Sequence, residues 1–259
     1  MTGIISVVTP VYEGGHQFLG EAYQSLLAQE LPDGWNWEWI VQEDGQTGVP
    51  GRMLPADDSR VSYNTGRRGG AAMARTMALA RVTGPMVRAL DADDLLPEGA
   101  LRRGIEALLA HPTVGWAVSP AVDLLPDGTL RSSSLDPEAG PLAPGLIADS
   151  YRADRYAVMG TTLTVYTELL HAVGGWPAVP ASEDAALLLL LEAVAPGWMI
   201  AEPGEIYRKH NGQVTAQPAH WEQAERDALS TVLLTRLDAL RRTGWRWVPS
   251  TELIAQVAK

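Results

Sequence analysis

The 259-residue sequence contains no cysteine. Both a disulfide framework and thiolate chemistry are therefore excluded. The sequence is also poor in positive charge: 20 lysine and arginine residues face 31 aspartate and glutamate residues, which gives a formal net charge of -11. This balance argues against broad nucleic-acid binding, which needs a basic surface. An anionic substrate would need a metal ion or local arginines in order to bind.

Long apolar runs are absent as well. The longest, AALLLLLEAVAPGWMI, is interrupted by Glu192 and Pro196 and falls well short of a membrane-spanning helix. The amino-terminal stretch MTGIISVVTPVYEGG has no basic region and reaches Glu13 too early for a signal peptide. We therefore expect a cytoplasmic protein without a membrane span.

The first hundred residues alternate between strand-like and helix-like patterns. Apolar, β-branched runs predict strands at 3–10, 37–45, 60–64 and 85–90. Helical periodicity predicts helices at 16–30 and 71–82, and Pro97 is expected at the first position of a third helix. This β-α-β-β-α-β order is typical of a doubly wound α/β fold, with a mainly parallel sheet covered on both faces.

The second half of the chain is less regular. Two short strands around a Pro-Asp-Gly turn are expected within 115–133, followed by a loop over 134–150. Helices are expected at 166–175, 183–195 and 219–245, and the last of these is long and amphipathic. Its apolar stripe favours core packing; an acceptor lid or a homodimer contact is the alternative.

Acidic residues gather where the predicted strands end. The segment LDADD places Asp91, Asp93 and Asp94 within four positions, while Glu13 and the pair Glu43–Asp44 follow two other strands. Ligands of doubly wound sheets lie beyond the carboxyl ends of the strands. One aspartate, most naturally Asp94, can be a helix cap. A divalent cation explains the clustering better, because Mg²⁺ or Mn²⁺ offsets carboxylate repulsion and keeps open positions for a diphosphate.

Five segments in this order resemble the family 2 glycosyltransferases of the GT-A fold. They are SVVTPVYEGG, IVQEDGQTG, NTGRRGGAAMARTMALARVTGPMVRALDADD, AVGGWPAVPASEDAALLLLL and YRKHNGQVT, which together cover about residues 3–215. The resemblance implies a GT-A domain over 1–215, with a nucleotide-sugar-binding part at 1–97 and an acceptor-side, catalytic part at 98–215. A helical extension at 216–259 is expected to pack on this domain.

The resemblance also implies roles for residues on the donor side. The acid after the second strand and the first aspartate of the DXD motif hold the nucleotide, so Asp44 and Asp91 are the expected contacts. The other residues expected in the nucleotide-sugar pocket are Thr9, Pro10, Tyr12, Glu13, Arg75 and Ala92. The family's usual aspartate pair is here Glu43–Asp44, which leaves the base open, with a UDP-sugar favoured. Asp93 is the expected metal ligand and His210 the second.

On the acceptor side, the resemblance selects Asp184 as the base that deprotonates the acceptor hydroxyl. Glu183 precedes it, and Ser182 can cap the helix that starts there. The alternative for Asp184 is a helix N-terminal acid that the helix dipole stabilises. Trp176 offers an apolar face to a sugar, with core packing as an equal alternative, and Arg208 is expected to contact phosphate or substrate.

The expected function is therefore metal-dependent, inverting transfer of a sugar from a nucleoside-diphosphate sugar to an unknown hydroxyl-bearing acceptor, with Mn²⁺ or Mg²⁺ as the cofactor. A sugar nucleotidyltransferase is one alternative, although the segment TPVYEGGHQFLG after the first strand lacks the lysine or arginine of its phosphate loop. A transferase-like domain that binds nucleotide or carbohydrate without turnover is another. A dehydrogenase is disfavoured, because no G-x-G-x-x-G follows the first strand.

Overall fold

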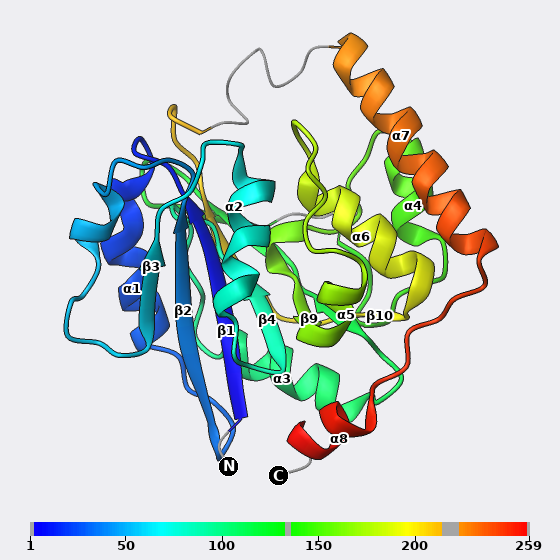
Figure 1. The fold of residues 1–259 in the computed structure, drawn as a ribbon, viewed down its shortest axis with the longest axis horizontal. Helices are drawn as coiled ribbons and strands as arrows, with labels where there is room; N and C mark the ends of the chain where they lie inside the picture. Colours follow the sequence, from blue (N-terminus) through cyan, green and yellow to red (C-terminus); the bar gives the residue numbers. More distant parts are fainter. Residues whose placement is uncertain (1–2, 133–135, 214–222, 258–259) are drawn as a thin grey trace.

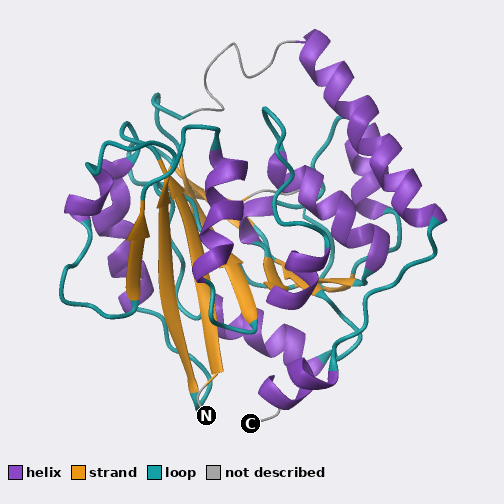
Figure 2. Ribbon diagram, in the orientation of Figure 1, coloured by secondary structure: helices purple, strands orange, loops and turns teal. Residues whose placement is uncertain are grey.

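The computed structural model describes residues 3–132, 136–213 and 223–257 (Figure 1). Its centre is an eight-stranded sheet in the order β3-β2-β1-β4-β9-β5-β10-β8. The first half of the chain supplies β1 (Gly3–Val11), β2 (Trp35–Glu43), β3 (Val61–Asn64) and β4 (Met86–Ala89). These four strands are parallel to one another, so their carboxyl ends lie at one edge of the sheet (Figure 2). The four predicted strands and the mainly parallel α/β fold are confirmed.

Helices cover both faces of this parallel region, as predicted. Tyr23 of α1 (Leu19–Leu27) stacks on Trp39 of β2, with ring centroids 5.9 Å apart. Arg81, just after α2 (Ala71–Ala78), donates a hydrogen bond to Gln42 Oε1 of the same strand at 3.0 Å. Since successive strand residues face opposite sides, odd-numbered Trp39 and even-numbered Gln42 place α1 and α2 on opposite faces. Cover on both faces explains why β1 is apolar and buried along most of its length.

The third helix begins later than predicted. α3 spans Ala100–Ala110 and follows Gly99, whose φ of +71° lies in the left-handed region. A left-handed residue interrupts a right-handed helix, so Pro97 lies in the preceding turn and not at the first helical position. The Ala100 N–H donates to the Pro97 carbonyl oxygen in this turn. The expectation for Pro97 was therefore wrong by about one turn.

The second half adds short strands to the same sheet and builds a second one. Joining the large sheet are β5 (Trp116–Val118), β8 (Gly140–Pro141), β9 (Thr164–Tyr166) and β10 (Gly197–Met199). β9 is antiparallel to both β4 and β5, and the sequence patterns did not predict it. The three-stranded sheet has the order β11-β6-β7, from β6 (Ala121–Leu124), β7 (Leu130–Ser132) and β11 (Glu205–Arg208). β6 and β7 confirm the hairpin expected around the Pro-Asp-Gly turn.

The segment predicted as a loop over 134–150 is partly regular. It contains β8 and the start of α4 (Leu146–Arg152). The carboxylate of Glu192 accepts hydrogen bonds from the backbone N–H groups of Ile147 and Ala148, at 2.7 and 3.2 Å. A carboxylate at a helix N-terminus stabilises the helix, and here it comes from more than 40 residues away. Local sequence could not reveal this cap, so the prediction of a loop was wrong at β8 and at the start of α4.

The remaining helices are α5 (Thr167–Ala172), α6 (Glu183–Val194), α7 (Gln223–Arg242) and α8 (Thr251–Val257). α7 buries Leu229, Leu233 and Leu237 and packs beside α6, so its apolar stripe belongs to the core (Figure 1). The start of the helix predicted from 219, and the proposed domain boundary between 215 and 216, lie outside the described residues. Within the described part of the chain, no helix combines the length and apolarity that crossing a membrane requires.

Candidate active site

Two acids at the carboxyl end of β2, Glu43 and Asp44, form hydrogen bonds with the loops beside this edge of the sheet. The Glu43 carboxylate accepts hydrogen bonds from Thr47, from the Gly48 N–H at 3.0 Å, and from the Tyr63 hydroxyl. Burial would raise the pKa of Glu43, but these hydrogen bonds lower it below its usual value. Asp44 Oδ1 accepts from the N–H groups of Gly69 and Gly70 at 2.6 and 3.0 Å. Glu43 is therefore a buried residue that holds the loop at 47–48 and Tyr63 in place. Asp44 holds the glycine-rich loop that precedes α2.

The residues expected at the end of β1 have different environments. Thr9 is fully buried, and its Oγ1 accepts from the Trp39 indole N–H at 2.8 Å, so its side chain supports the sheet. Pro10 lies opposite Gln42 where β1 pairs with β2. The Tyr12 ring lies directly over the glycines that follow it, and its hydroxyl donates to the Gly212 carbonyl at 3.3 Å. Tyr12 and the exposed Glu13 therefore border the open end of the site.

The two expected metal ligands lie side by side. Asp93 Oδ2 and His210 Nε2 are 2.8 Å apart, although the residues are more than 100 positions apart in the chain. β11 brings them together: an isolated bridge pairs Leu95 with Ile206, and the Arg208 side chain donates to the Asp93 carbonyl oxygen at 2.8 Å. The structure therefore places Arg208 beside the DXD segment, on the donor side of the site.

Asp94, the residue after Asp93, is fully buried and caps no helix. Its Oδ1 accepts from the Arg208 backbone N–H at 2.7 Å, and α3 has no side-chain cap. The helix-cap interpretation was therefore wrong, because α3 begins only at Ala100, after Gly99, and the Asp94 carboxylate binds the Arg208 N–H instead. Burial, together with neighbouring Glu205, raises the pKa of Asp94 well above its usual value. Burial likewise raises the pKa of Glu205 to about 7, against the opposing charge of Arg88.

Arg75 of α2 joins the two acidic segments of the site. Its side chain donates to Asp91 of the DXD motif and, at 2.6 Å, to Glu183 Oε1 at the start of α6. Only 2% of Arg75 is exposed. Burial alone would lower the pKa of Arg75, but the charges of Asp91 and Glu183 raise it above its usual value. The guanidinium also lies 6.0 Å from the ring centroid of Trp176, which is itself 2% exposed. Burial of Trp176 favours its core-packing interpretation.

Asp184 follows Glu183 in the first turn of α6. Burial, and then the charge of Glu183, raise the pKa of Asp184 to about 6. A Cβ added to Gly160 would lie 2.6 Å from Asp184 Oδ2, so the absence of a side chain at Gly160 makes room for this carboxylate. Ser182 does not cap the helix: it has a φ of +56°, makes no capping hydrogen bond, and its Oγ lies 3.1 Å from the Tyr156 hydroxyl.

Sequence patterns did not identify three of these neighbours. Gly160, Tyr156 and Glu205 reach the site through contacts that bridge 24, 26 and 111 positions, respectively, to Asp184, Ser182 and Asp94. No local motif marks any of them. The glycine-rich loop was recognisable from the sequence, but its hydrogen bonds to Asp44 were not predicted.

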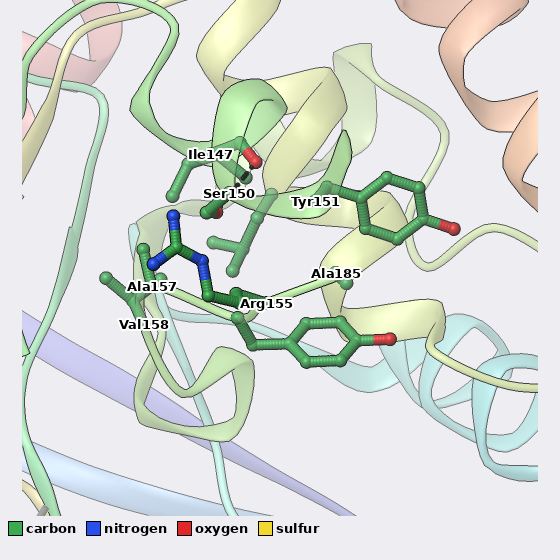
Figure 3. Close-up of a pocket in the computed structure, with 9 residues that line it drawn as sticks. Ile147, Ser150, Tyr151, Arg155, Ala157, Val158 and Ala185 are labelled. Carbon is green, nitrogen blue, oxygen red and sulfur yellow. Dashed lines mark hydrogen bonds between the residues drawn. The ribbon is translucent and has the colours of Figure 1, made fainter. Parts of the chain in front are cut away.

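Two hollows flank these residues. One, of about 780 Å³ and open to solvent, lies between the glycine-rich loop and α2; it is lined by Glu43, Arg67, Met73, Met77 and Arg81 among others. The second, with room for only about one water molecule, lies between α4, the segment 155–158 and the first turns of α6 (Figure 3). One hollow thus lies beside Glu43 and the glycine-rich loop, and the other lies beside Ala185, the residue after Asp184.

The side chains of the site can supply part of a metal-binding site. Among the described residues, no group of three or more histidine and carboxylate side chains is arranged to hold a metal by itself. Asp93 and His210 do form a pair of an oxygen and a nitrogen ligand. Mg²⁺ and similar ions commonly bind one or two protein ligands together with substrate phosphates and water. The pair fits such an ion, whose remaining positions a diphosphate would complete.

Solved structures of other proteins share this fold. Over 94% of this chain and 74% of the other, the fold superposes on TarS of S. aureus in complex with UDP-GlcNAc, with a TM-score of 0.66 at 18% identity. The mannosyltransferase PcManGT from Pyrobaculum calidifontis, in complex with GDP-Man and Mn²⁺, gives a TM-score of 0.58 at 21% identity over 99% of this chain and 68% of its own. The fold is therefore that of the GT-A glycosyltransferases.

The matches to sequence relatives cover a smaller share of those proteins' length than the matches to solved structures do. The chain is 32% identical over 105 residues to the glycosyltransferase GlyG of Streptococcus pneumoniae serotype 4, across 39% of this chain and 34% of GlyG. It is 29% identical over 177 residues to the O-antigen biosynthesis protein RfbC of Myxococcus xanthus, across 66% of this chain and 13% of RfbC. The chain thus spans at most about a third of these relatives. The family model "Glycosyl transferase family 2" matches residues 6–142, more than half of the chain. The chain belongs to glycosyl transferase family 2.

Proposed function

We propose that this chain transfers a sugar from a nucleoside-diphosphate sugar to an acceptor hydroxyl, with inversion at the anomeric carbon and Asp184 as the general base. One observation carries the proposal: buried Arg75 contacts both Asp91 of the DXD motif and Glu183 next to Asp184. The acids that would hold the donor and the acid that would accept the proton therefore belong to one site.

The donor would bind along the carboxyl edge of β1, β2 and β4. Asp44 and Asp91 can accept hydrogen bonds from a base N–H and a ribose hydroxyl, respectively. Tyr12, which borders this edge, supplies an aromatic surface for the nucleotide. A UDP-sugar is the favoured donor, and the complexes of TarS with UDP-GlcNAc and of PcManGT with GDP-Man support a nucleoside-diphosphate sugar in general.

A divalent cation, Mn²⁺ or Mg²⁺, would be held by Asp93 and His210 and would supply positive charge for the departing diphosphate. The Mn²⁺ in the PcManGT complex supports this choice. Arg208 orients the ligand pair, because it donates to the Asp93 carbonyl oxygen and its own backbone N–H holds Asp94. With a net charge of -11, the protein has few other ways to attract an anionic donor.

Asp184 would take the acceptor proton during attack. A new bond forms between the acceptor oxygen and the anomeric carbon while the bond from that carbon to the diphosphate oxygen breaks. The hydroxyl proton passes to the Asp184 carboxylate, and the nucleoside diphosphate leaves with the bonding electron pair. A carboxylate whose pKa is raised to about 6 is a stronger base than an ordinary aspartate and is still ionised at neutral pH.

The experiment that tests this function is donor turnover. The protein is incubated with UDP-GlcNAc, UDP-glucose, UDP-galactose and GDP-mannose, with Mn²⁺ or with a chelator, and release of free nucleoside diphosphate is measured. We expect slow release with at least one donor in Mn²⁺ and none with the chelator. Nucleotide binding without release in Mn²⁺ would indicate a non-catalytic domain. Pyrophosphate release from a nucleoside triphosphate and a sugar phosphate would indicate a nucleotidyltransferase instead.

A further inference from the structure

Glu205, the first residue of β11, is a fully buried carboxylate with partners in two distant segments of the chain. Its Oε1 accepts a hydrogen bond from the Thr161 hydroxyl at 2.7 Å. Asp94 Oδ2 and Glu205 Oε2 are also buried and, within the described residues, accept from no N–H group or hydroxyl. The two carboxyl groups are instead hydrogen-bonded to each other. Glu205 therefore connects the Asp94 segment to the Thr161 segment.

The first of these segments carries Asp93, one of the two proposed cation ligands. Asp94 follows Asp93 directly, and its Oδ1 accepts from the backbone N–H of Arg208, the last residue of β11. The other proposed ligand, His210, lies two residues beyond that strand. The contact between Asp94 and Glu205 therefore joins the two chain segments that bring Asp93 and His210 to within 2.8 Å of each other.

The second segment approaches the proposed base. Thr161 lies in η4 (Gly160–Thr162), a single turn of 3-10 helix. Gly160, the first residue of this turn, approaches Asp184 so closely that a Cβ there would lie 2.6 Å from Asp184 Oδ2. Because Thr161 follows Gly160 directly, its hydrogen bond to Glu205 fixes the turn against which the Asp184 carboxylate packs.

The charges around Glu205 argue against a role in stability alone. The buried guanidinium of Arg88 supplies the opposite charge, 3.9 Å from Glu205 Oε2, and donates to the carbonyl oxygens of Thr162 and Gly204. Removing charged groups from water costs free energy, and apolar residues of the same volume often give equal or greater stability. A buried polar network whose members all need partners can instead select one arrangement of the segments that it joins.

We propose that Glu205 is a positioning residue for sugar transfer: it joins the segments of the cation ligands to the turn beside Asp184, and so fixes the base relative to the leaving group. The proposal rests on the proposed function, since it takes Asp184 as the base and Asp93 and His210 as the ligands. Glu205 acts through Asp94 and Thr161 and needs no contact with substrate. Transfer requires the base, the acceptor hydroxyl and the leaving group to be aligned, so loss of this connection should lower kcat more than donor affinity.

The test uses a nucleoside-diphosphate sugar that the wild-type protein hydrolyses. It compares kcat for hydrolysis with the calorimetric dissociation constant of the matching nucleoside diphosphate in Mn²⁺, and thermal melting checks folding. The variants are Glu205→Ala, Glu205→Gln, Thr161→Val and the double variant Glu205→Ala/Thr161→Val. The matched control is Glu38→Ala, in the amino-terminal half of β2, because the Glu38 carboxylate likewise joins two distant segments through the Ser6 hydroxyl and the Thr83 N–H.

We expect Glu205→Ala and Thr161→Val each to lower kcat per folded molecule about tenfold, while the dissociation constant stays within about threefold of wild type. The double variant should be little worse than Glu205→Ala, because both changes break the same connection. Glu205→Gln should stay within about threefold of wild type, because its amide can accept from Thr161 and donate to Asp94. Glu38→Ala should lower the melting temperature and leave kcat per folded molecule within about threefold.

The proposal is overturned if kcat per folded molecule is unchanged in Glu205→Ala and Thr161→Val, since the cluster would then contribute stability alone. Equal losses of kcat and of nucleotide affinity would also overturn it, as would a Glu205→Gln variant as poor as Glu205→Ala. If Glu205→Ala does not fold, the same measurements on Thr161→Val decide between these outcomes. Absence of donor hydrolysis in the wild-type protein would instead refute the proposed function itself.

Discussion

The donor half and the acceptor half of this molecule are built in different ways. In the donor half, β1 and β2 pair over nine residues, and their ends place the acids at one edge. In the acceptor half, β5, β9 and β10 have three residues each, and long-range contacts fix the functional groups: Glu192 caps α4, and Gly160 adjoins Asp184. Donor binding should therefore be robust to changes in the acceptor half, whereas acceptor use should be sensitive to single side chains.

Two buried arginines of the donor half differ in their partners. Arg75 lies between two acids, and their charges outweigh the effect of burial, so its pKa is raised. Arg88 donates to the carbonyl oxygens of Thr162 and Gly204, and Glu205 lies 3.9 Å away. Burial therefore lowers the pKa of Arg88 to about 10. Arg75 links the two halves of the site, whereas Arg88 supports the backbone beneath it.

The largest expected effect is loss of the Asp93–His210 pair. Asp93→Ala should lower turnover by about 10³-fold or more and abolish the Mn²⁺ dependence of nucleoside-diphosphate binding, because the charge that stabilises the leaving group is lost. Turnover and calorimetric titration with UDP, with and without Mn²⁺, measure both. The matched control is Asp227→Ala, at an exposed aspartate of α7 that accepts a hydrogen bond from Gln223. Native activity in Asp93→Ala would contradict the proposal that Asp93 is a metal ligand in the donor half.

Exchange of the two arginines for lysine should have the next largest effect. Arg75→Lys keeps the charge but loses the fork that contacts two carboxylates at once, so we expect kcat to fall by about 10–100-fold. Arg88→Lys, its control, should lower the melting temperature while kcat per folded molecule stays within about threefold. Measurements of kcat and of the melting temperature on both variants distinguish a loss of catalysis from a loss of stability. Equal losses of kcat in Arg75→Lys and Arg88→Lys would contradict the proposal that Arg75 in particular connects the donor acids to the first turn of α6.

The pH dependence is expected to report the acceptor half. Asp184 must be ionised to accept a proton, and its pKa is raised to about 6, so kcat should fall about tenfold per unit as the pH drops below about 6. Because the charge of Glu183 contributes to this rise, Glu183→Gln should move the acidic limb to lower pH. Profiles of kcat from pH 4.5 to 8, a range of about 3.5 units around that pKa, measure the shift. An unmoved limb would show that another group controls it.

The sequence predicted the donor half well and the acceptor half only in part. β-branched runs, helical periodicity and acids at strand ends are local signals, and they correctly placed β1 to β4, α2 and the Asp93 segment. α4, β9 and the role of Asp94 depend on partners far along the chain, such as Glu192 and Glu205, and no local pattern encodes those contacts. The family resemblance singled out Asp184 and His210 as candidates, whereas Gly160 and Tyr156 were found only in the structure.

The proposed mechanism gives two roles to separate residues: one set of acids would hold the donor, and Asp184 would take the proton. Asp184→Asn keeps the shape and hydrogen-bonding capacity of the side chain but cannot accept the proton. The most direct test measures, on this one variant, the dissociation constant for the donor in Mn²⁺ and the rate of transfer. We predict a dissociation constant within about threefold of wild type and a rate lower by about 10²–10⁴-fold. Near-native transfer, or loss of donor binding equal to the loss of rate, would contradict the account.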